Sequence, residues 1–306
     1  IQGASLYQGG PIRYEYEAEN YANGKTVDWI DLVTQTGNIQ DHNLSISGGR
    51  ENVKYYVSGD FMNEKGIVKG YNYKRYSIRT NIDMNPTDYL TIGTNSYIVS
   101  HNRDGGRANL LNSEAMSPYA KVYEEDGSLT HYPMYSETLW ANPLLPATLD
   151  PERRQFNISV NGYGEVNFGN IWSPLSGLQY KLNAGYTYVP WRTNEYEGKS
   201  VYNMTGWGKI FNRETQTWTL ENILTYNKDF DVHHFDFTGL YAASRKHYQE
   251  STSEGSIFPN DDLEWGNLGA AATHKVGSYA DLYTSLSQMG RINYSYDSRY
   301  LFTFTV

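Results

Sequence analysis

The chain has 306 residues, of which 29 are tyrosine and none is cysteine, with a net charge of −9 and a mean hydropathy of −0.65. The lack of cysteine excludes a disulfide scaffold and a cysteine-based zinc site. The sequence also lacks the run of about 20 apolar residues that a transmembrane helix needs. The acidic balance argues against nucleic acid as a partner, because phosphate binding requires a basic face.

Period-two alternation of apolar and polar residues is the strongest pattern along the chain, and it predicts strands with two different faces. In residues 155–168, for example, Phe156 and Ile158 share one face while Asn157 and Asn161 lie on the other. The predicted strands, in chain order, are residues 38–47, 53–63, 73–85, 88–101, 154–169, 178–190, 212–228, 232–249, 280–296 and 299–306. A helical period competes only weakly, at residues 107–116.

Strand length and loop order both favour a membrane barrel over a sandwich. Several predicted strands have roughly 11–18 residues, whereas strands in soluble proteins usually have about 5–6 and a bilayer-crossing strand needs about 9–11. Short connections at 48–52, 85–87, 169–177, 229–231 and 297–298 alternate with long ones at 64–72, 102–153, 191–211 and 250–279. Outer-membrane barrels have short periplasmic turns and long extracellular loops. We therefore expect an all-β chain that is part of a large antiparallel transmembrane barrel.

The two faces of such a wall have different tasks. Lipid accepts no backbone hydrogen bonds, so a spanning sheet must close, with an apolar outer face and tyrosine at the interfaces. Polar residues are expected to face the lumen: Arg75, Arg79, Asp83, Asn157, Asn161 and Glu165. They could line a solute path or anchor a plug. We favour plug anchoring, since a wide barrel must be filled to avoid leakage.

Aromatic residues in or beside the long loops are candidate ligand-binding residues, because sugar rings stack on aromatic faces. They are Trp140, Trp191, Tyr196, Tyr202, Trp207 and Trp265. Alternatively, each of these residues could pack one loop against another, belong to the aromatic girdle at the membrane interface or contact a partner protein. Trp191, Tyr202 and Trp207 are the best candidates, because their loop is short enough to stay near the barrel mouth.

Catalytic and metal-binding patterns are weak. The only adjacent histidine pair, His233–His234, enters a predicted strand, where alternate residues point to opposite sides. Acidic loop residues could bind Ca²⁺ through oxygen ligands, although solvated charge is favoured for both groups: Glu124, Glu125 and Asp126, and Asp261, Asp262 and Glu264. We expect no catalytic residues, no metal and no cofactor apart from this weak calcium alternative.

Both termini resemble cuts within a longer chain. Ile1 is not followed by a signal peptide, and Val306 ends a strand-like run. We expect residues 1–37 to be a first extracellular loop region and residues 38–306 to be barrel strands and loops, with a plug domain absent from this chain.

Residues Val27 to Asn63 carry a family resemblance. They contain D-W-x-D (Asp28 to Asp31), T-G (Thr36 and Gly37), H-N-L-S-I-S-G-G (His42 to Gly49) and K-Y-Y-V-S (Lys54 to Ser58). These motifs resemble the start of the barrel in SusC/RagA-type TonB-dependent transporters of Bacteroidetes. Residues 63–97 and 290–306 agree with it, and the resemblance is weaker over 102–153 and 191–279.

The resemblance implies a 22-stranded outer-membrane barrel plugged by an N-terminal domain, of which this chain would supply about ten strands. It also implies a SusD-like surface lipoprotein, two such complexes pairing as a dimer of heterodimers, and energy from TonB–ExbB–ExbD through the missing N-terminal part. The implied function is import of a large nutrient, a glycan or an oligopeptide. The alternative is a glycan-binding surface β-protein without transport activity, with an outer-membrane enzyme a distant third; membrane fractionation separates the first two.

Overall fold

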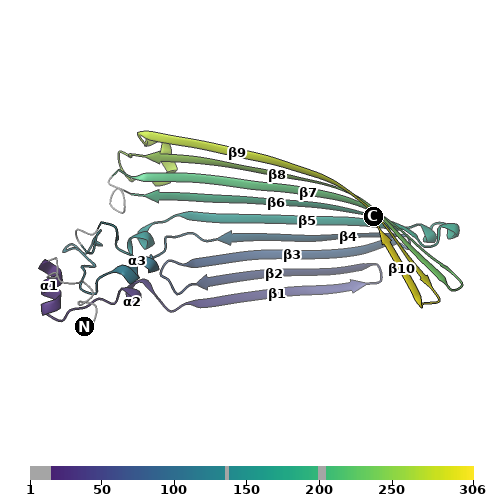
Figure 1. Cartoon of the computed structure of the whole chain (residues 1–306), viewed down its shortest axis with the longest axis horizontal. Coiled ribbons are helices and arrows are strands. Elements are labelled where there is room, and N and C mark those ends of the chain that lie inside the picture. The colour runs from purple at the N-terminus through teal and green to yellow at the C-terminus, as the bar shows by residue number, and fades with distance from the viewer. Residues whose placement is uncertain (1–14, 135–137, 199–204) are drawn as a thin grey trace.

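A computed structural model describes residues 15–134, 138–198 and 205–306. These residues form one ten-stranded sheet in which the strands follow one another in sequence order and all neighbours are antiparallel (Figure 1). The strands are β1 (Asn38–Arg50), β2 (Val53–Lys65), β3 (Asn72–Thr87), β4 (Leu90–Asn102), β5 (Glu152–Asn167), β6 (Leu178–Glu197), β7 (Trp207–Phe230), β8 (His233–Ser256), β9 (Thr273–Tyr296) and β10 (Tyr300–Thr305). All ten predicted strands are confirmed.

Strands β6 to β9 are longer than predicted. They contain 20, 24, 24 and 24 residues, so the predicted loops 191–211 and 250–279 are too long. Some of the added segments, such as residues 250–256, are polar on both faces. A strand that continues beyond the bilayer keeps its backbone pairing but has no lipid to select apolar side chains. The alternation from which we predicted the strands therefore stops before the strands do.

The connections at the two ends of the sheet differ in length, as predicted, although two long connections account for most of the difference. The segments 103–151 and 257–272 are long, whereas 51–52, 88–89 and 231–232 are tight turns. Two connections depart from the prediction, because the predicted long loop 64–72 shortens to 66–71 and the predicted short turn extends over 168–177. The helices α1 (Glu15–Ala22), α2 (Trp29–Val33) and α3 (Leu110–Ala115) gather at the end with the long connections (Figure 1). The helix α3 falls within the predicted helical segment 107–116, whereas the sequence pattern predicted neither α1 nor α2.

No helix within the described residues is long and apolar enough to cross a membrane.

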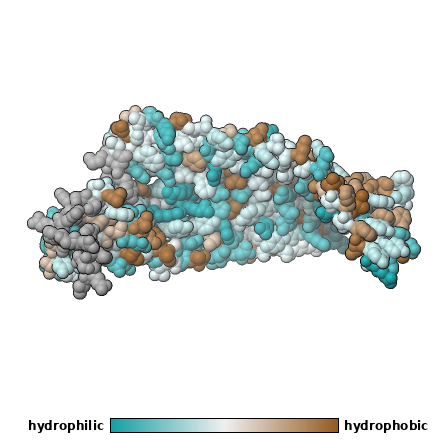
Figure 2. Space-filling view, viewed as in Figure 1, coloured by the Kyte–Doolittle hydropathy of each residue, from teal (hydrophilic) through white to brown (hydrophobic). Residues whose placement is uncertain are grey.

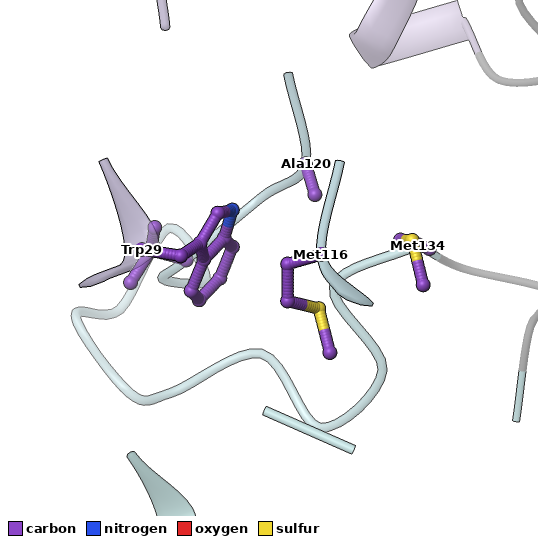
Figure 3. Close-up of a cluster of buried hydrophobic side chains, with 5 residues drawn as sticks. Trp29, Met116, Ala120 and Met134 are labelled. Carbon is purple, nitrogen blue, oxygen red and sulfur yellow. The ribbon is translucent and has the colours of Figure 1, made fainter. Parts of the chain in front are cut away.

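A small hydrophobic core, the Trp29 cluster, joins α2 to the long connection after β4 (Figure 3). The Trp29 side chain is 3 % exposed, and its Nε1 donates to the Ser117 carbonyl at 2.8 Å. Asp28 fixes the start of α2, because its side chain accepts from the Asp31 amide at 3.0 Å. The cluster consists of Trp29, Met116, Ala120, Val122 and Met134. The D-W-x-D motif thus has a structural role: it caps a helix and inserts its tryptophan into the long connection after β4.

Strand register sorts the side chains onto two faces. Leu220 pairs with Ala184 and Ala243, and the neighbouring Thr219 pairs with Gly185 and Ser244. We call the face with Leu220 the lipid face and the face with Thr219 the lumen face. The lipid face of β7 also carries Trp218, Leu224 and Tyr226. Figure 2 shows hydrophilic side chains along the middle of the visible face and hydrophobic ones gathered at the end where β10 lies.

The sheet is open within the described residues, since β1 and β10 each have a neighbour on one side only. An unpaired edge is not tolerated in lipid, where each unsatisfied backbone group costs several kcal/mol. The ten strands are therefore part of a larger antiparallel barrel wall.

Candidate functional site

One row of side chains crosses the lumen face near the end of the sheet that carries the long connections. Each member pairs in register with the next, so all of them lie at one level of the wall. The row consists of Arg75, His101, Gln155, Trp191, Arg213, Glu250 and Tyr279. A groove of about 850 Å³ follows this level from β4 to β9 and touches the last five of these residues together with flanking residues of both faces.

Trp191 is the centre of this row, but it lies in β6 rather than in the loop where we predicted it. The guanidinium carbons of Arg103 and Arg213 lie 5.9 Å and 5.1 Å from its ring centroid. Its Nε1 donates to Thr193 Oγ1 at 2.8 Å, which fixes the indole. Arg103 also lies over the ring of Tyr73, at 5.0 Å. Cation–π contacts of this kind orient a guanidinium without neutralising its charge.

Arg107 extends this group from the connection after β4. Its guanidinium lies 4.2 Å from the Tyr71 ring centroid, and its Nε is buried without a hydrogen-bond partner in the described structure. Burial lowers the pKa of Arg107, and the charges of Arg153 and Arg103 lower it further. Tyr71 is two residues before Tyr73, over whose ring Arg103 lies, so Arg107 and Arg103 lie over rings of the same short segment. We call Arg103, Arg107 and Arg213 the arginine cluster.

Some of the other arginines around the wall are neutralised by carboxylates. Arg75 pairs with Asp60 at 2.7 Å, Arg153 pairs with Glu195 at 2.9 Å, and Arg154 pairs with Asp104 at 2.8 Å and Glu152 at 3.1 Å. Among the described residues, no carboxylate lies within 4.0 Å of a guanidinium nitrogen of the arginine cluster. The partners of the cluster are aromatic rings, as they are for Arg79 over Tyr97 and Arg192 over Trp265. What distinguishes the cluster is that two of its guanidinium groups, those of Arg103 and Arg213, lie near one ring, that of Trp191.

A second hollow lies beside the arginine cluster on the same lumen face of β8 and β9. This tyrosine pocket has a volume of about 690 Å³ and is lined by Lys246, Tyr248, Tyr279, Asp281 and Tyr283. Tyr279 and Tyr283 are 56 % and 63 % exposed in this segment of the wall, in which β10 pairs only with residues 291–296 of β9. Exposed rings beside an amine and a carboxylate are suited to sugars, which offer apolar ring faces and hydroxyl groups.

The six predicted lumen residues share one face by register, and most have partners on that face. Arg79 lies over the Tyr97 ring at 5.3 Å. Asp83 accepts from the Tyr163 hydroxyl at 2.6 Å. The remaining members are Arg75, which is paired as above, Glu165 with Lys181 at 3.5 Å, Asn161 beside Gly185, and Asn157, whose buried Oδ1 has no partner in the described structure. None of these contacts decides between plug anchoring and a solute path.

The other predicted aromatic residues do not join Trp191. Trp207 begins β7 and is not a loop residue, which corrects its predicted place. Trp140 packs against the Trp29 cluster, and Trp265 packs against the buried Tyr196. Tyr202 lies outside the described residues. Sequence reasoning did not select the arginine cluster or the tyrosine pocket, because their members are up to about 180 residues apart and meet only through strand register.

The acidic and histidine candidates are engaged in local contacts. Glu124 pairs with Lys121 at 2.7 Å, and Asp261 accepts from the Tyr196 hydroxyl at 2.6 Å. His233 Nδ1 bonds the Tyr294 hydroxyl at 2.7 Å. Residues 15–134, 138–198 and 205–306 contain no group of three or more His, Asp or Glu side chains arranged to hold a metal ion.

Comparison with known proteins gives a consistent set of relatives, although no family model matches. The chain is 30 % identical over 310 residues to TonB-dependent receptor P3 of Formosa agariphila, covering 94 % of this chain and 30 % of that protein. It is 25 % identical over 304 residues to TonB-dependent receptor SusC of Bacteroides thetaiotaomicron, covering 91 % and 30 %. It therefore spans about a third of the length of these relatives.

The fold has solved counterparts. A structure of the RagAB peptide transporter superposes with a TM-score of 0.76 at 20 % identity, covering 95 % of this chain and 34 % of that one. The "open-open" state of the RagAB peptide importer superposes with a TM-score of 0.73 at 21 % identity. At this identity the match establishes the fold, and the sequence relatives agree with it.

Proposed function

We propose that this chain is part of the barrel of a SusC/RagA-type TonB-dependent receptor of the bacterial outer membrane and that it helps to import a large nutrient. The relatives that match it are receptors and transporters rather than enzymes. The observation that carries the proposal is a wall with an apolar lipid face and, on its lumen face, a row of charged and aromatic residues at the end with the long connections. A receptor needs both features to capture a solute outside and pass it through the lumen.

The partners of the complete receptor follow from this proposal. We propose a plug domain inside the barrel, energy from TonB–ExbB–ExbD acting on that plug, and a SusD-like lipoprotein that covers the extracellular mouth, with two such complexes able to pair. The proteins that this chain resembles include SusC and a peptide transporter. The cargo classes to be compared are accordingly oligosaccharides and oligopeptides.

Uptake in living cells tests the proposal. A strain that lacks the full-length receptor would be compared with its complemented parent for uptake of labelled oligosaccharide and oligopeptide pools, with and without a functional TonB. We expect at least one pool to need both the receptor and TonB. Equal uptake of all pools in the deleted and complemented strains would contradict the proposal.

The polar lumen residues are proposed to anchor the plug. Replacing Arg79 and Glu165 together with glutamine should loosen the plug, because each substitution removes a charge from the lumen face. We expect increased sensitivity to a large antibiotic that the intact outer membrane excludes. Lys74→Gln is the matched control, since it removes a charge from the lipid-face side of the same strand β3. Equal sensitivity of the double variant and the wild type would favour a solute path instead.

A further inference from the structure

Three arginines of this wall carry charge that no carboxylate neutralises. Arg103 and Arg213 both lie within 6 Å of the Trp191 ring, and Arg107 lies over Tyr71. Some arginines elsewhere on the wall, such as Arg75 and Arg153, are in ion pairs, whereas Arg79 and Arg192 are single arginines over rings. A guanidinium held on a ring keeps its in-plane N–H donors free for a second partner.

The local charge balance is positive although the whole chain carries −9. Glu250 stands opposite Arg213 in register, but it accepts a hydrogen bond from the Tyr248 hydroxyl and is not within 4.0 Å of the guanidinium. Glu195 is engaged with Arg153. The arginine cluster is therefore a cationic site on an acidic protein. A free site of this kind suits carboxylate or sulfate groups, which guanidinium binds with two parallel hydrogen bonds.

The tyrosine pocket lies at the same height on the lumen face as the arginine cluster, farther along the sheet. Tyr279 pairs in register with Glu250, which pairs with Arg213, so the pocket begins two strands from the arginine cluster. Neighbouring strands lie about 4.8 Å apart, so the distance between the two is about that of one or two sugar units. A ligand that satisfies both parts needs apolar ring faces with hydroxyl groups at one end and an anionic group at the other.

We propose that this part of the lumen wall binds an acidic oligosaccharide, with its carboxylate or sulfate groups on Arg103, Arg107 and Arg213 and a sugar ring on Tyr279 or Tyr283. This inference rests on the proposed import function and names the cargo class. An acidic peptide would satisfy the arginines, but a peptide of acidic residues alone has no ring to place on Tyr279 or Tyr283.

Matched probes test the charge requirement without any mutation. Binding to the purified full-length receptor, with its lipoprotein partner, would be measured by calorimetry for three pairs: hexagalacturonate and its methyl ester, sulfated maltohexaose and maltohexaose, and hexaglutamate and hexaglutamine. We expect one acidic oligosaccharide to bind at least about tenfold more tightly than its neutral counterpart, and to weaken with added salt. Discrimination confined to the peptide pair, or no discrimination in any pair, would overturn the proposal.

Variants locate the site. Arg103→Gln and Arg213→Gln should each weaken binding of the preferred acidic oligosaccharide by about tenfold and leave binding of its neutral counterpart nearly unchanged. Arg245→Gln is the control, because it makes the same change on the lipid face of β8 and should have no effect. Tyr283→Ala should weaken both members of the oligosaccharide pair. An equal effect of the Arg103, Arg213 and Arg245 variants would overturn the assignment.

A failure of this inference can be told apart from a failure of the proposed import function. If TonB-dependent uptake of a neutral glycan or a peptide persists and the arginine variants do not change it, then the import function stands and this inference fails. If no pool needs the receptor and TonB, then the import function itself fails.

Discussion

Replacing Leu220 with arginine in the full-length receptor is expected to destabilise the barrel by up to about 2–4 kcal/mol, because a charge on the lipid face is poorly solvated. Leu220 lies between Trp218 and Leu224 on the lipid face of β7, and its side chain is 38 % exposed. The measurement is the free energy of unfolding in lipid vesicles, from a urea titration that follows heat-modifiable migration on a gel.

The adjacent residue provides the control. Thr219→Arg adds the same side chain one residue away, where it would face water in the lumen beside Gly185 and Ser244. The loss there should be well under that of Leu220→Arg. Equal losses at the two positions would contradict the assignment of the two faces, and a larger loss at Thr219 would reverse it.

Replacing Trp29 with alanine is expected to have the second large effect, a loss of local stability at the end of the sheet with the long connections. The side chain is almost fully buried and packs with Met116, Ala120 and Met134, so its loss leaves a cavity and should cost about 3–5 kcal/mol of local stability. The Nε1 bond to the Ser117 carbonyl is lost as well. Because the cluster joins α2 to the connection after β4, we expect that region to open while the strands keep their pairing.

Hydrogen exchange measures this local opening. In Trp29→Ala, amides of residues 110–134 should exchange faster, whereas those of β7 and β8 should not change. Ile30→Ala is the control, since Ile30 lies in the same helix but is 41 % exposed. Uniform loss of protection across the strands would mean that the Trp29 cluster supports the whole wall rather than one end of it.

The strands were predictable where lipid acts on the sequence. Residues 155–168 alternate cleanly because one face meets apolar chains and the other meets water, and the structure places β5 there. The ends of β6 to β9 were not predictable in this way, since both faces of a strand above the bilayer meet water. The helices α1 and α2 were missed because they are short, with eight and five residues.

The candidate site was predictable only in part. Trp191 was selected by its residue type, although its predicted place in a loop was wrong. Arg213 stands beside it through the β6–β7 register, and Arg103 reaches it from the far side of β5. A single sequence does not reveal such pairs, because the turn between two strands sets which residues meet. The distribution of charge along the sequence did not predict the arginine cluster either, because its arginines are far apart in an acidic chain.

The most direct measurement of the central claim is the accessibility of single spin labels along β7 of the full-length receptor in a bilayer. This chain contributes no cysteine of its own, so a thiol introduced into it is the only one in this segment. We expect labels at Leu220 and Leu224 to be relaxed by oxygen dissolved in lipid, and labels at Thr219 and Thr225 by a water-soluble nickel chelate. The same strong access of the nickel chelate to all four positions would contradict a membrane-spanning barrel wall.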